Sequence, residues 1–259
     1  MIDERAIIHP SATIGLNVTI GPWTLIKENA IIGDGTEIAA HVVIDKNTIL
    51  GKRNKIYSYA SVGSDPQHLS YKGEESCLEV GDNNVIREFV TINRGTKEGH
   101  SVTRIGDNNY LMAYSHVAHD CVVGSNVIFA NTASIAGHVS VGDHAILGAF
   151  SGVHQFCRVG AYCFLGRAAK VYQDILPYML VTGNPGAPSG LNTVGLRRHG
   201  FNGNTMRSLK QAFRLIYRGN LGLEGIRLEL EKLAKETPEV SHLLNMINTS
   251  SRGFARHTK

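Results

Sequence analysis

The sequence has few cysteines, no long apolar run and no leader pattern, and each of these shortages excludes a class of protein. Its four cysteines, Cys77, Cys121, Cys157 and Cys163, form no Cys-x-x-Cys pair, which argues against a disulfide framework or a zinc ribbon. No stretch reaches the 18 or so apolar residues of a membrane span, and the first residues, MIDERAIIHP, are unlike a signal peptide. We therefore expect a soluble, cytoplasmic protein with reduced thiols and no stable membrane insertion.

In place of these features the sequence has a strict period of six residues. Apolar residues, nearly all aliphatic, recur at every sixth position in three stretches. The 25 positions are Ile8, Ile14, Ile20, Ile26, Ile32, Ile38, Ile44, Leu50, Ile56, Val62, Val80, Ile86, Ile92, Ile105, Leu111, Val117, Val123, Phe129, Ile135, Val141, Leu147, Val153, Val159, Leu165 and Val171. Such a period fits neither an α-helix nor a long strand of period two. It is typical of a parallel β-helix built from hexapeptide repeats.

The geometry of such a β-helix follows from the period. Three six-residue units close one triangular coil, so residues 18 apart should stack about 4.8 Å from each other in neighbouring coils. The apolar residue of each unit should point into the prism, where its burial contributes about 1.5–3 kcal/mol. We therefore predict a mainly β fold.

Two segments interrupt the period, and a regular rod can accommodate them only as loops. They are residues 64–77 (SDPQHLSYKGEESC) and 94–103 (RGTKEGHSVT). A segment rich in glycine and proline, residues 177–195, should end the prism. Helical spacing follows in residues 205–218, 223–236 and 239–248. We predict a β-helix over residues 1–190 and a C-terminal helical domain over residues 191–259.

Four histidines should gather on one side of the prism. Val117, Ile135 and Val153 open corresponding units of three successive coils. The polar residues and the glycine beside them, which should fall within roughly 10–15 Å, are His116, His119, Gly137, His138, His154 and Gln155. Both loops should leave the prism near this side. A single outward histidine is usually only solvated, but four of them beneath two loops favour a functional site.

Two chemistries remain open for this cluster. Histidines from adjacent coils could bind zinc, as in the carbonic anhydrases of hexapeptide fold. Those enzymes place two histidine ligands five residues apart, whereas His116 and His119 are three apart. Alternatively, His119 is a general base that takes a proton from an attacking sugar hydroxyl. Asp120 would then orient the ring, which requires the pair to lie at a corner, because neighbours on a strand point to opposite faces. Gly137 could offer a backbone N–H to an oxyanion.

Longer motifs point to one family. The stretches HVAHDC, AGHVSV, VHQFC, QDILPYMLVTGNP and GLRRHGF, with a helical tail, resemble the UDP-N-acetylglucosamine acyltransferases that begin lipid A synthesis. The resemblance implies a left-handed β-helix and a homotrimer with sites between the prisms. It also implies transfer of a 3-hydroxyacyl group from acyl carrier protein to the 3-hydroxyl of UDP-N-acetylglucosamine, without a metal or other cofactor.

The resemblance also implies roles for individual residues. His119 matches the general base, Asp120 its partner and Gly137 the oxyanion donor. Positions that contact the nucleotide sugar or the acyl donor are matched by His116, His138, His154, Gln155, Asn192 and Arg198.

Several positions depart from the family pattern. The first loop commonly reads Gln-Asp-Leu-Lys-Tyr, but here His68 and Ser70 replace the two charged residues that contact the sugar. We still expect His68 to face the substrate, and the accepted sugar could instead carry an amine at carbon 3. Val194 stands where an acidic residue contacts the nucleotide, and His199 replaces the second arginine of a pair. Arg167 stands where the family sets acyl-chain length, often with glycine, so we expect a shorter acyl chain.

One helix has a basic face. Arg207, Lys210, Arg214 and Arg218 fall within about 80° of each other at 100° per residue, beside an apolar stripe. Such a face is often only solvated, but it would suit an acidic acyl carrier protein. We expect no nucleic-acid partner, because no recognition fold or aromatic platform accompanies the basic residues.

Overall fold

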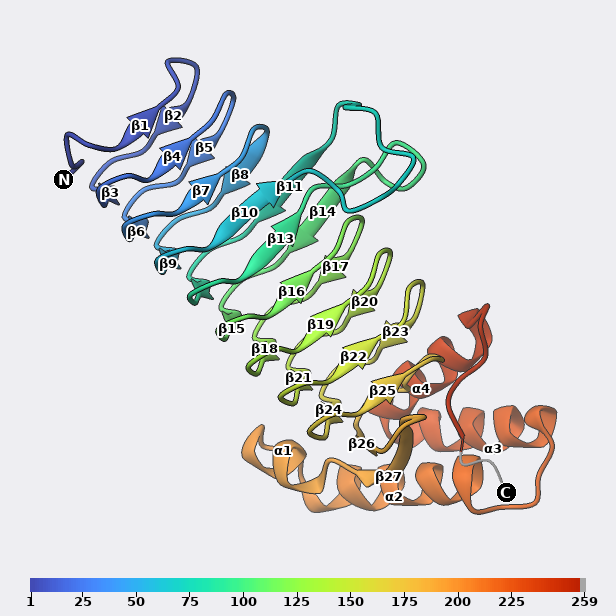
Figure 1. Cartoon of the computed structure of the whole chain (residues 1–259). Coiled ribbons are helices and arrows are strands. Elements are labelled where there is room, and N and C mark those ends of the chain that lie inside the picture. The colour runs from blue at the N-terminus through green and yellow to red at the C-terminus, as the bar shows by residue number, and fades with distance from the viewer. Residues whose placement is uncertain (257–259) are drawn as a thin grey trace.

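A computed structural model describes residues 1–256 and has three sheets that form the faces of a triangular prism (Figure 1). Each six-residue unit forms a strand, usually of two residues, and a corner. The first strand residue points outwards and the second, which is the apolar position of the period, points inwards. Ile26, Ile44 and Val62 are fully buried in this way. Burial of a continuous apolar stack is therefore what closes the coils.

All 27 strands of residues 1–256 belong to the three faces, and β1 to β25 alternate strictly between them. The first face consists of β1 (Ile7–Ile8), β4 (Leu25–Ile26), β7 (Val43–Ile44), β10 (Ser61–Ser64), β13 (Thr91–Asn93), β16 (His116–Val117), β19 (Ser134–Ile135), β22 (Gly152–Val153) and β25 (Lys170–Val171). The second face consists of β2 (Thr13–Ile14), β5 (Ile31–Ile32), β8 (Thr48–Leu50), β11 (Cys77–Val80), β14 (Val102–Ile105), β17 (Val122–Val123), β20 (Ser140–Val141) and β23 (Arg158–Val159). The third face consists of β3 (Thr19–Ile20), β6 (Glu37–Ile38), β9 (Lys55–Ile56), β12 (Val85–Ile86), β15 (Tyr110–Leu111), β18 (Ile128–Phe129), β21 (Ile146–Leu147), β24 (Phe164–Leu165), β26 (Met179–Thr182) and β27 (Ala187–Leu191).

The register shows how the interruptions fit into the prism. Val117 pairs with Ile135, and Ile135 with Val153, at the regular step of 18 residues. Val62 pairs with Ile92, and Ile92 with Val117, at longer steps. Each interruption is therefore an insertion into one coil that leaves the apolar stack unbroken. The predicted parallel β-helix is confirmed.

The two insertions leave the prism side by side at the corner between the first and second faces (Figure 1). The first runs from β10 to β11 and the second from β13 to β14. Gly63 begins the first insertion with φ +83°, and a Cβ there would lie 1.9 Å from Thr48 Oγ1. A larger residue could not make this exit, because both the backbone conformation and the space require glycine.

The chain after the prism differs in two ways from what its composition predicts. Residues 177–195 are not merely an irregular end, because β26 extends the third face in parallel with β24 and β27 pairs with it antiparallel. The helices are α1 (Thr193–Arg198), α2 (Gly203–Tyr217), α3 (Leu223–Glu236) and α4 (Pro238–Thr249). The short α1 has no predicted counterpart, since six residues are too few to show a helical period. The helices lie at the end of the prism (Figure 1), and the domain boundary at residue 190 stays a prediction.

None of the helices within residues 1–256 combines the length and the apolarity needed to cross a membrane.

Candidate functional site

A groove of about 490 Å³ lies over the first face, between β16 and β25 and beneath the first loop. Six of the predicted site residues line it: His68, His116, His119, Gly137, His154 and Gln155. Lys170 and Tyr172 close its far end. The groove therefore brings together a loop residue and residues of three successive coils, as the spacing of the histidines predicts.

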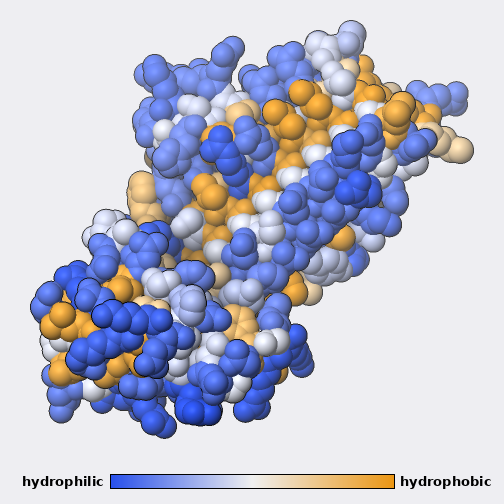
Figure 2. All heavy atoms as spheres, turned by 180° about the vertical axis from the view of Figure 1, so that it is seen from behind, coloured by the Kyte–Doolittle hydropathy of each residue, from blue (hydrophilic) through white to orange (hydrophobic). Residues whose placement is uncertain are grey.

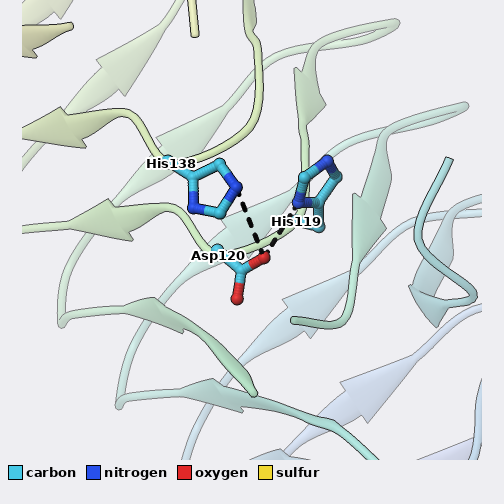
Figure 3. A group of neighbouring side chains, drawn as sticks. All are labelled: His119, Asp120 and His138. Carbon is cyan, nitrogen blue, oxygen red and sulfur yellow. Dashed lines mark hydrogen bonds and ion pairs between the residues drawn. The ribbon is translucent and has the colours of Figure 1, made fainter. Parts of the chain in front are cut away.

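His119 and Asp120 lie in the turn after β16, at the corner between the first and second faces. Asp120 has φ 59°, a conformation that Asp tolerates better than most residues. This bend turns both side chains to the same side, and His119 Nδ1 lies 2.9 Å from Asp120 Oδ2 (Figure 3). The corner that the pair requires is therefore present.

The second loop surrounds the Asp120 carboxylate with donors. Thr96 donates from its hydroxyl to Oδ2 at 2.6 Å, and from its backbone N–H to both oxygens at 3.0 and 3.1 Å. The backbone N–H of His100 donates to Oδ1 at 2.9 Å. Burial by itself would raise the pKa of Asp120, but the hydrogen bonds from His119, Thr96 and His100 outweigh it and hold the pKa well below its usual range. Asp120 is therefore an anion at any pH near neutrality.

An ionised Asp120 settles which nitrogen of His119 carries the proton. A carboxylate can only accept, so Nδ1 must donate to it and Nε2 is left as an acceptor. A Cβ at Gly137 would lie 2.8 Å from Nε2 and 3.2 Å from Nδ1 of His119, so Nε2 is the ring nitrogen nearer to that position. Gly137 is needed here because the imidazole packs directly on its backbone. No acceptor for the Gly137 N–H is present among residues 1–256.

Thr96 and His100 are functional neighbours that the sequence did not single out. Both belong to the second loop, and the period of six says only where that loop leaves the prism. It does not say that Thr96 in this loop contacts Asp120, which lies 24 residues further along the chain. No motif in one sequence carries that information, because the contact is made by an irregular segment.

Two other histidines adjoin the pair but play different geometric parts. His138 lies behind it, outside the lining of the groove. Its Nε2 is 3.9 Å from Asp120 Oδ2, and its ring stacks on Phe156 with centroids 4.4 Å apart. His116 projects from β16 and its Nδ1 is 2.7 Å from the Thr91 hydroxyl. Burial lowers the pKa of both His116 and His138, so both are neutral near pH 7.

A zinc ion at this cluster would compete with the hydrogen bonds that the Asp120 carboxylate already accepts. One ligand atom from each of His119, Asp120 and His138 can be chosen so that all three lie within 4.8 Å of each other. The Asp120 oxygens, however, already accept hydrogen bonds from Thr96, His100 and His119, and a metal would have to displace some of them. A base held by an acid accounts for these contacts without any displacement.

Three predicted site residues lie away from the groove. Asn192 and Arg198 line a second cavity of about 300 Å³ beside the third face, together with Val194. His199 does not line it, because its ring packs against His144 at a centroid distance of 4.8 Å. Arg167 is exposed at the corner between the third and first faces, with its guanidinium carbon 5.6 Å from the centre of the Phe150 ring.

Known proteins share both parts of this structure. A family model described as Udp N-acetylglucosamine O-acyltransferase, domain 2, matches residues 174–255, and a model of bacterial transferase hexapeptides matches residues 11–46 and 103–137. The acyl-[acyl-carrier-protein]–UDP-N-acetylglucosamine O-acyltransferase of Alkalilimnicola ehrlichii is 51% identical, over 98% of this chain and 99% of that protein. The protein of that name from Halorhodospira halophila is 49% identical with the same coverage.

Solved structures agree with the sequence relatives. The UDP-N-acetylglucosamine acyltransferase of Francisella novicida superposes with a TM-score of 0.98 at 41% identity, over 100% of this chain and 95% of that chain. LpxA from Acinetobacter baumannii superposes with a TM-score of 0.96 at 41% identity, over 98% of this chain and 99% of that chain. The predicted left-handed β-helix with a C-terminal helical region is thereby confirmed. With relatives this similar along nearly its whole length, the chain belongs to the UDP-N-acetylglucosamine O-acyltransferase family.

Proposed function

We propose that this chain transfers a 3-hydroxyacyl group from acyl carrier protein to the 3-hydroxyl of UDP-N-acetylglucosamine, the first step of lipid A synthesis. The observation that carries the proposal is the His119–Asp120 pair, in which Nδ1 of His119, a residue that lines the groove, lies 2.9 Å from the Asp120 carboxylate. The relatives are named for transfer from acyl carrier protein to UDP-N-acetylglucosamine, and this supports the choice of donor and acceptor.

The residues of the groove account for each proton in this reaction. Nε2 of His119 takes the proton of the sugar hydroxyl as the oxygen attacks the thioester carbon, and Asp120 stabilises the imidazolium that forms. The N–H of Gly137 donates to the oxyanion of the tetrahedral intermediate. When the carbon–sulfur bond breaks, the imidazolium returns the proton to the departing thiolate. No metal or other cofactor takes part in these steps.

His68 bears on which sugar is accepted. Its ring meets the His119 ring edge-on with centroids 5.3 Å apart. His68 therefore lies beside the place where the attacking group of the sugar would approach His119. A histidine can accept a hydrogen bond from a hydroxyl or from an amine, whereas the family's usual aspartate adds a negative charge. The second candidate function is therefore the same transfer to a sugar that has an amine at carbon 3.

A mass-resolved transfer assay tests the function. It offers 3-hydroxyacyl carrier protein thioesters of several lengths with UDP-N-acetylglucosamine or its 3-amino analogue, with and without a chelator. We expect an ester product on the hydroxyl sugar that is insensitive to the chelator. Product only on the amine would favour the second candidate, and product on neither sugar would overturn both.

We infer that the active form is a homotrimer. The outward residues of the third face form an apolar stripe in register, and each is only half-buried in a single chain. They are Val85, Tyr110, Ile128, Ile146, Phe164 and Leu180. Figure 2 shows that hydrophobic surface runs along the prism between hydrophilic strips. A flat apolar face of this kind is typical of a subunit interface, which another copy would cover.

The homotrimer also gives Asn192 and Arg198 a place in catalysis. The cavity that they line includes Ile146, Phe164 and Leu180 of the apolar stripe. A neighbouring copy packed on this stripe would bring its own groove close to the cavity. We therefore propose that Asn192 and Arg198 contact substrate bound beside His119 of an adjacent subunit.

We also propose that the exposed face of α2 docks the acyl carrier protein. Arg207, Lys210, Arg214 and Arg218 are all exposed, whereas Met206, Leu209 and Ile216 on the other side are buried. Lys210, Arg214 and Arg218 line a shallow hollow beside β27. A cationic hollow of this kind suits a strongly acidic carrier protein.

Reversing one charge in this hollow should weaken the use of the donor. We expect Lys210→Glu to raise the KM for the acyl carrier protein thioester about tenfold at low salt, with a smaller effect at high salt. The KM for the sugar should not change. Lys235→Glu, an equal charge reversal on an exposed position of α3, is the matched control. Equal effects of the two variants would exclude α2 as the docking face.

Arg167 should limit the length of the acyl chain. A long cationic side chain at this corner occupies space that glycine would leave open. We expect Arg167→Gly to shift the products towards longer acyl chains, measured by mass spectrometry with a panel of thioesters offered in competition. An unchanged product distribution, or a wild-type preference for the longest chains, would contradict this role.

A further inference from the structure

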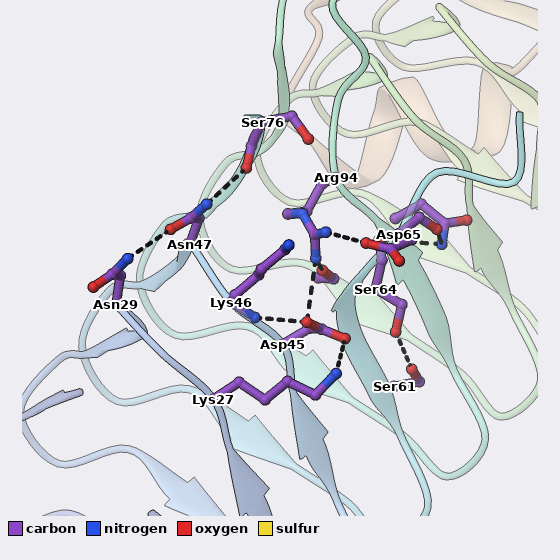
Figure 4. A network of polar contacts seen from close by, with 12 residues as sticks. Lys27, Asn29, Asp45, Lys46, Asn47, Ser61, Ser64, Asp65, Ser76 and Arg94 are labelled. Carbon is purple, nitrogen blue, oxygen red and sulfur yellow. Dashed lines mark hydrogen bonds and ion pairs between the residues drawn. The ribbon is translucent and has the colours of Figure 1, made fainter. Parts of the chain in front are cut away.

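Among residues 1–256, Arg94 has the largest fully buried side chain. Its charge has no part in the mechanism proposed above. It follows β13, at the start of the second loop. Its Nη1 donates to the Gly63 carbonyl and lies 3.3 Å from Asp45 Oδ1. Its Nη2 donates to Asp65 Oδ1 (Figure 4). The same nitrogen donates to the Tyr71 hydroxyl at 3.3 Å. Burying a guanidinium is costly unless it is paired, so these partners must be held in place.

All the loop partners of Arg94 belong to the first loop, and they hold one another as well. Tyr71 donates from its hydroxyl to Asp65 Oδ1 and to the Glu74 carbonyl, both at 3.3 Å. The neighbouring Asn93 donates to the Asp65 carbonyl at 2.7 Å. Through its two contacts, Tyr71 connects Asp65 near the start of the loop to Glu74 near its end. The loop is therefore closed around Arg94.

This closed loop carries a residue of the groove. The Tyr71 N–H donates to the His68 carbonyl at 3.0 Å, which fixes the turn of residues 68–71. His68 in turn presents its ring edge to His119. Leu69 at the tip is completely exposed, so the tip itself has no packing to hold it. The placement of His68 therefore depends on the contacts at the base of the loop.

The same short segment also reaches the acid of the proposed catalytic pair. Two residues after Arg94, Thr96 donates twice to Asp120. Residues 94–96 are all buried. One buried segment thus holds the first loop on one side and the Asp120 carboxylate on the other.

We propose that Arg94 is a positioning residue for the acceptor sugar, which acts by holding the first loop so that His68 lies beside His119. This inference rests on the proposed function for its kinetic consequence, and on the contacts of Arg94 alone for its structural one. The contacts among Arg94, Asp65 and Tyr71 are called the clamp below. Weakening the clamp should raise the KM for the sugar more than it lowers kcat, because the reacting groups of His119 and Asp120 stay in place.

The test uses variants of two loop residues outside the apolar stack, the exposed Asp65 and the half-buried Tyr71, which should fold normally, and one variant of Arg94 itself. Asp65→Ala removes the carboxylate that Arg94 and Tyr71 contact. Tyr71→Phe removes the hydroxyl that contacts Arg94, Asp65 and Glu74. Arg94→Lys keeps the positive charge but loses the planar guanidinium that reaches several acceptors at once. We expect the KM for the sugar to rise about tenfold and kcat to change by less than about threefold. Glu75→Ala is the matched control, since Glu75 is exposed on the same loop, outside the clamp.

A second readout does not depend on activity. Lys72 is an exposed trypsin site within the clamped loop. Cleavage after Lys72, followed by mass spectrometry, should become several times faster in the three clamp variants than in Glu75→Ala, because a released loop is opened more often. Unchanged cleavage and an unchanged sugar KM in Asp65→Ala and Tyr71→Phe would overturn the proposal. A wild-type enzyme without transfer activity but with clamp-dependent cleavage would instead count against the proposed function.

Discussion

Replacing His119 by alanine should lower kcat about 10²- to 10⁴-fold, the usual contribution of a general base. The sugar hydroxyl would then have to lose its proton to water. Folding should be affected little, because the ring lies at a corner outside the apolar stack and Asp120 keeps its hydrogen bonds to Thr96 and His100. The measurement is steady-state kinetics of the transfer reaction together with the thermal midpoint of unfolding.

His144→Ala is the matched control for this variant. His144 is also a histidine in a corner of the prism, but it stacks on Tyr162 away from the groove. We expect its kcat to match the wild type. Wild-type turnover by His119→Ala would remove it from the mechanism.

Replacing Asp120 by asparagine should lower kcat by a similar factor, about 10²- to 10⁴-fold. An amide cannot neutralise the imidazolium, and its carbonyl holds the correct tautomer less firmly than a carboxylate does. The KM for either substrate should change far less. A kcat close to that of the wild type would show that Asp120 serves the structure rather than the reaction.

The same variant has a pH-dependent effect on stability whose sign follows from the lowered pKa. Asp120 has a lower pKa in the folded chain than in the unfolded chain, where about 3.9 is usual. Its contribution to stability is therefore complete above that unfolded value and is lost as the pH falls towards the folded value. We expect the wild type to exceed Asp120→Asn in thermal midpoint at pH 7, and the difference to shrink below about pH 4. A constant difference would contradict this linkage.

The sequence carries the architecture because the apolar period is itself the physical cause of the coils. Residues such as Ile26, Ile44 and Val62 are buried at every sixth position, and no competing arrangement would bury them all. For the same reason the sequence places His116, His119 and Gly137 over one face. The period also marks where Gly63 and Arg94 leave it, although it cannot say how the segments that follow are folded.

The apolar period alone therefore predicts the β-helix, the coil in which each residue of the groove lies and the side of the prism on which these residues gather. The folded chain was needed to show that Asp120 bends back onto His119, that Thr96 and His100 surround its carboxylate, and that Arg94 contacts the loop of His68. Each of these depends on contacts of irregular segments with residues 20 or more positions away, or on one corner dihedral, and neither has a period that could be read along the chain.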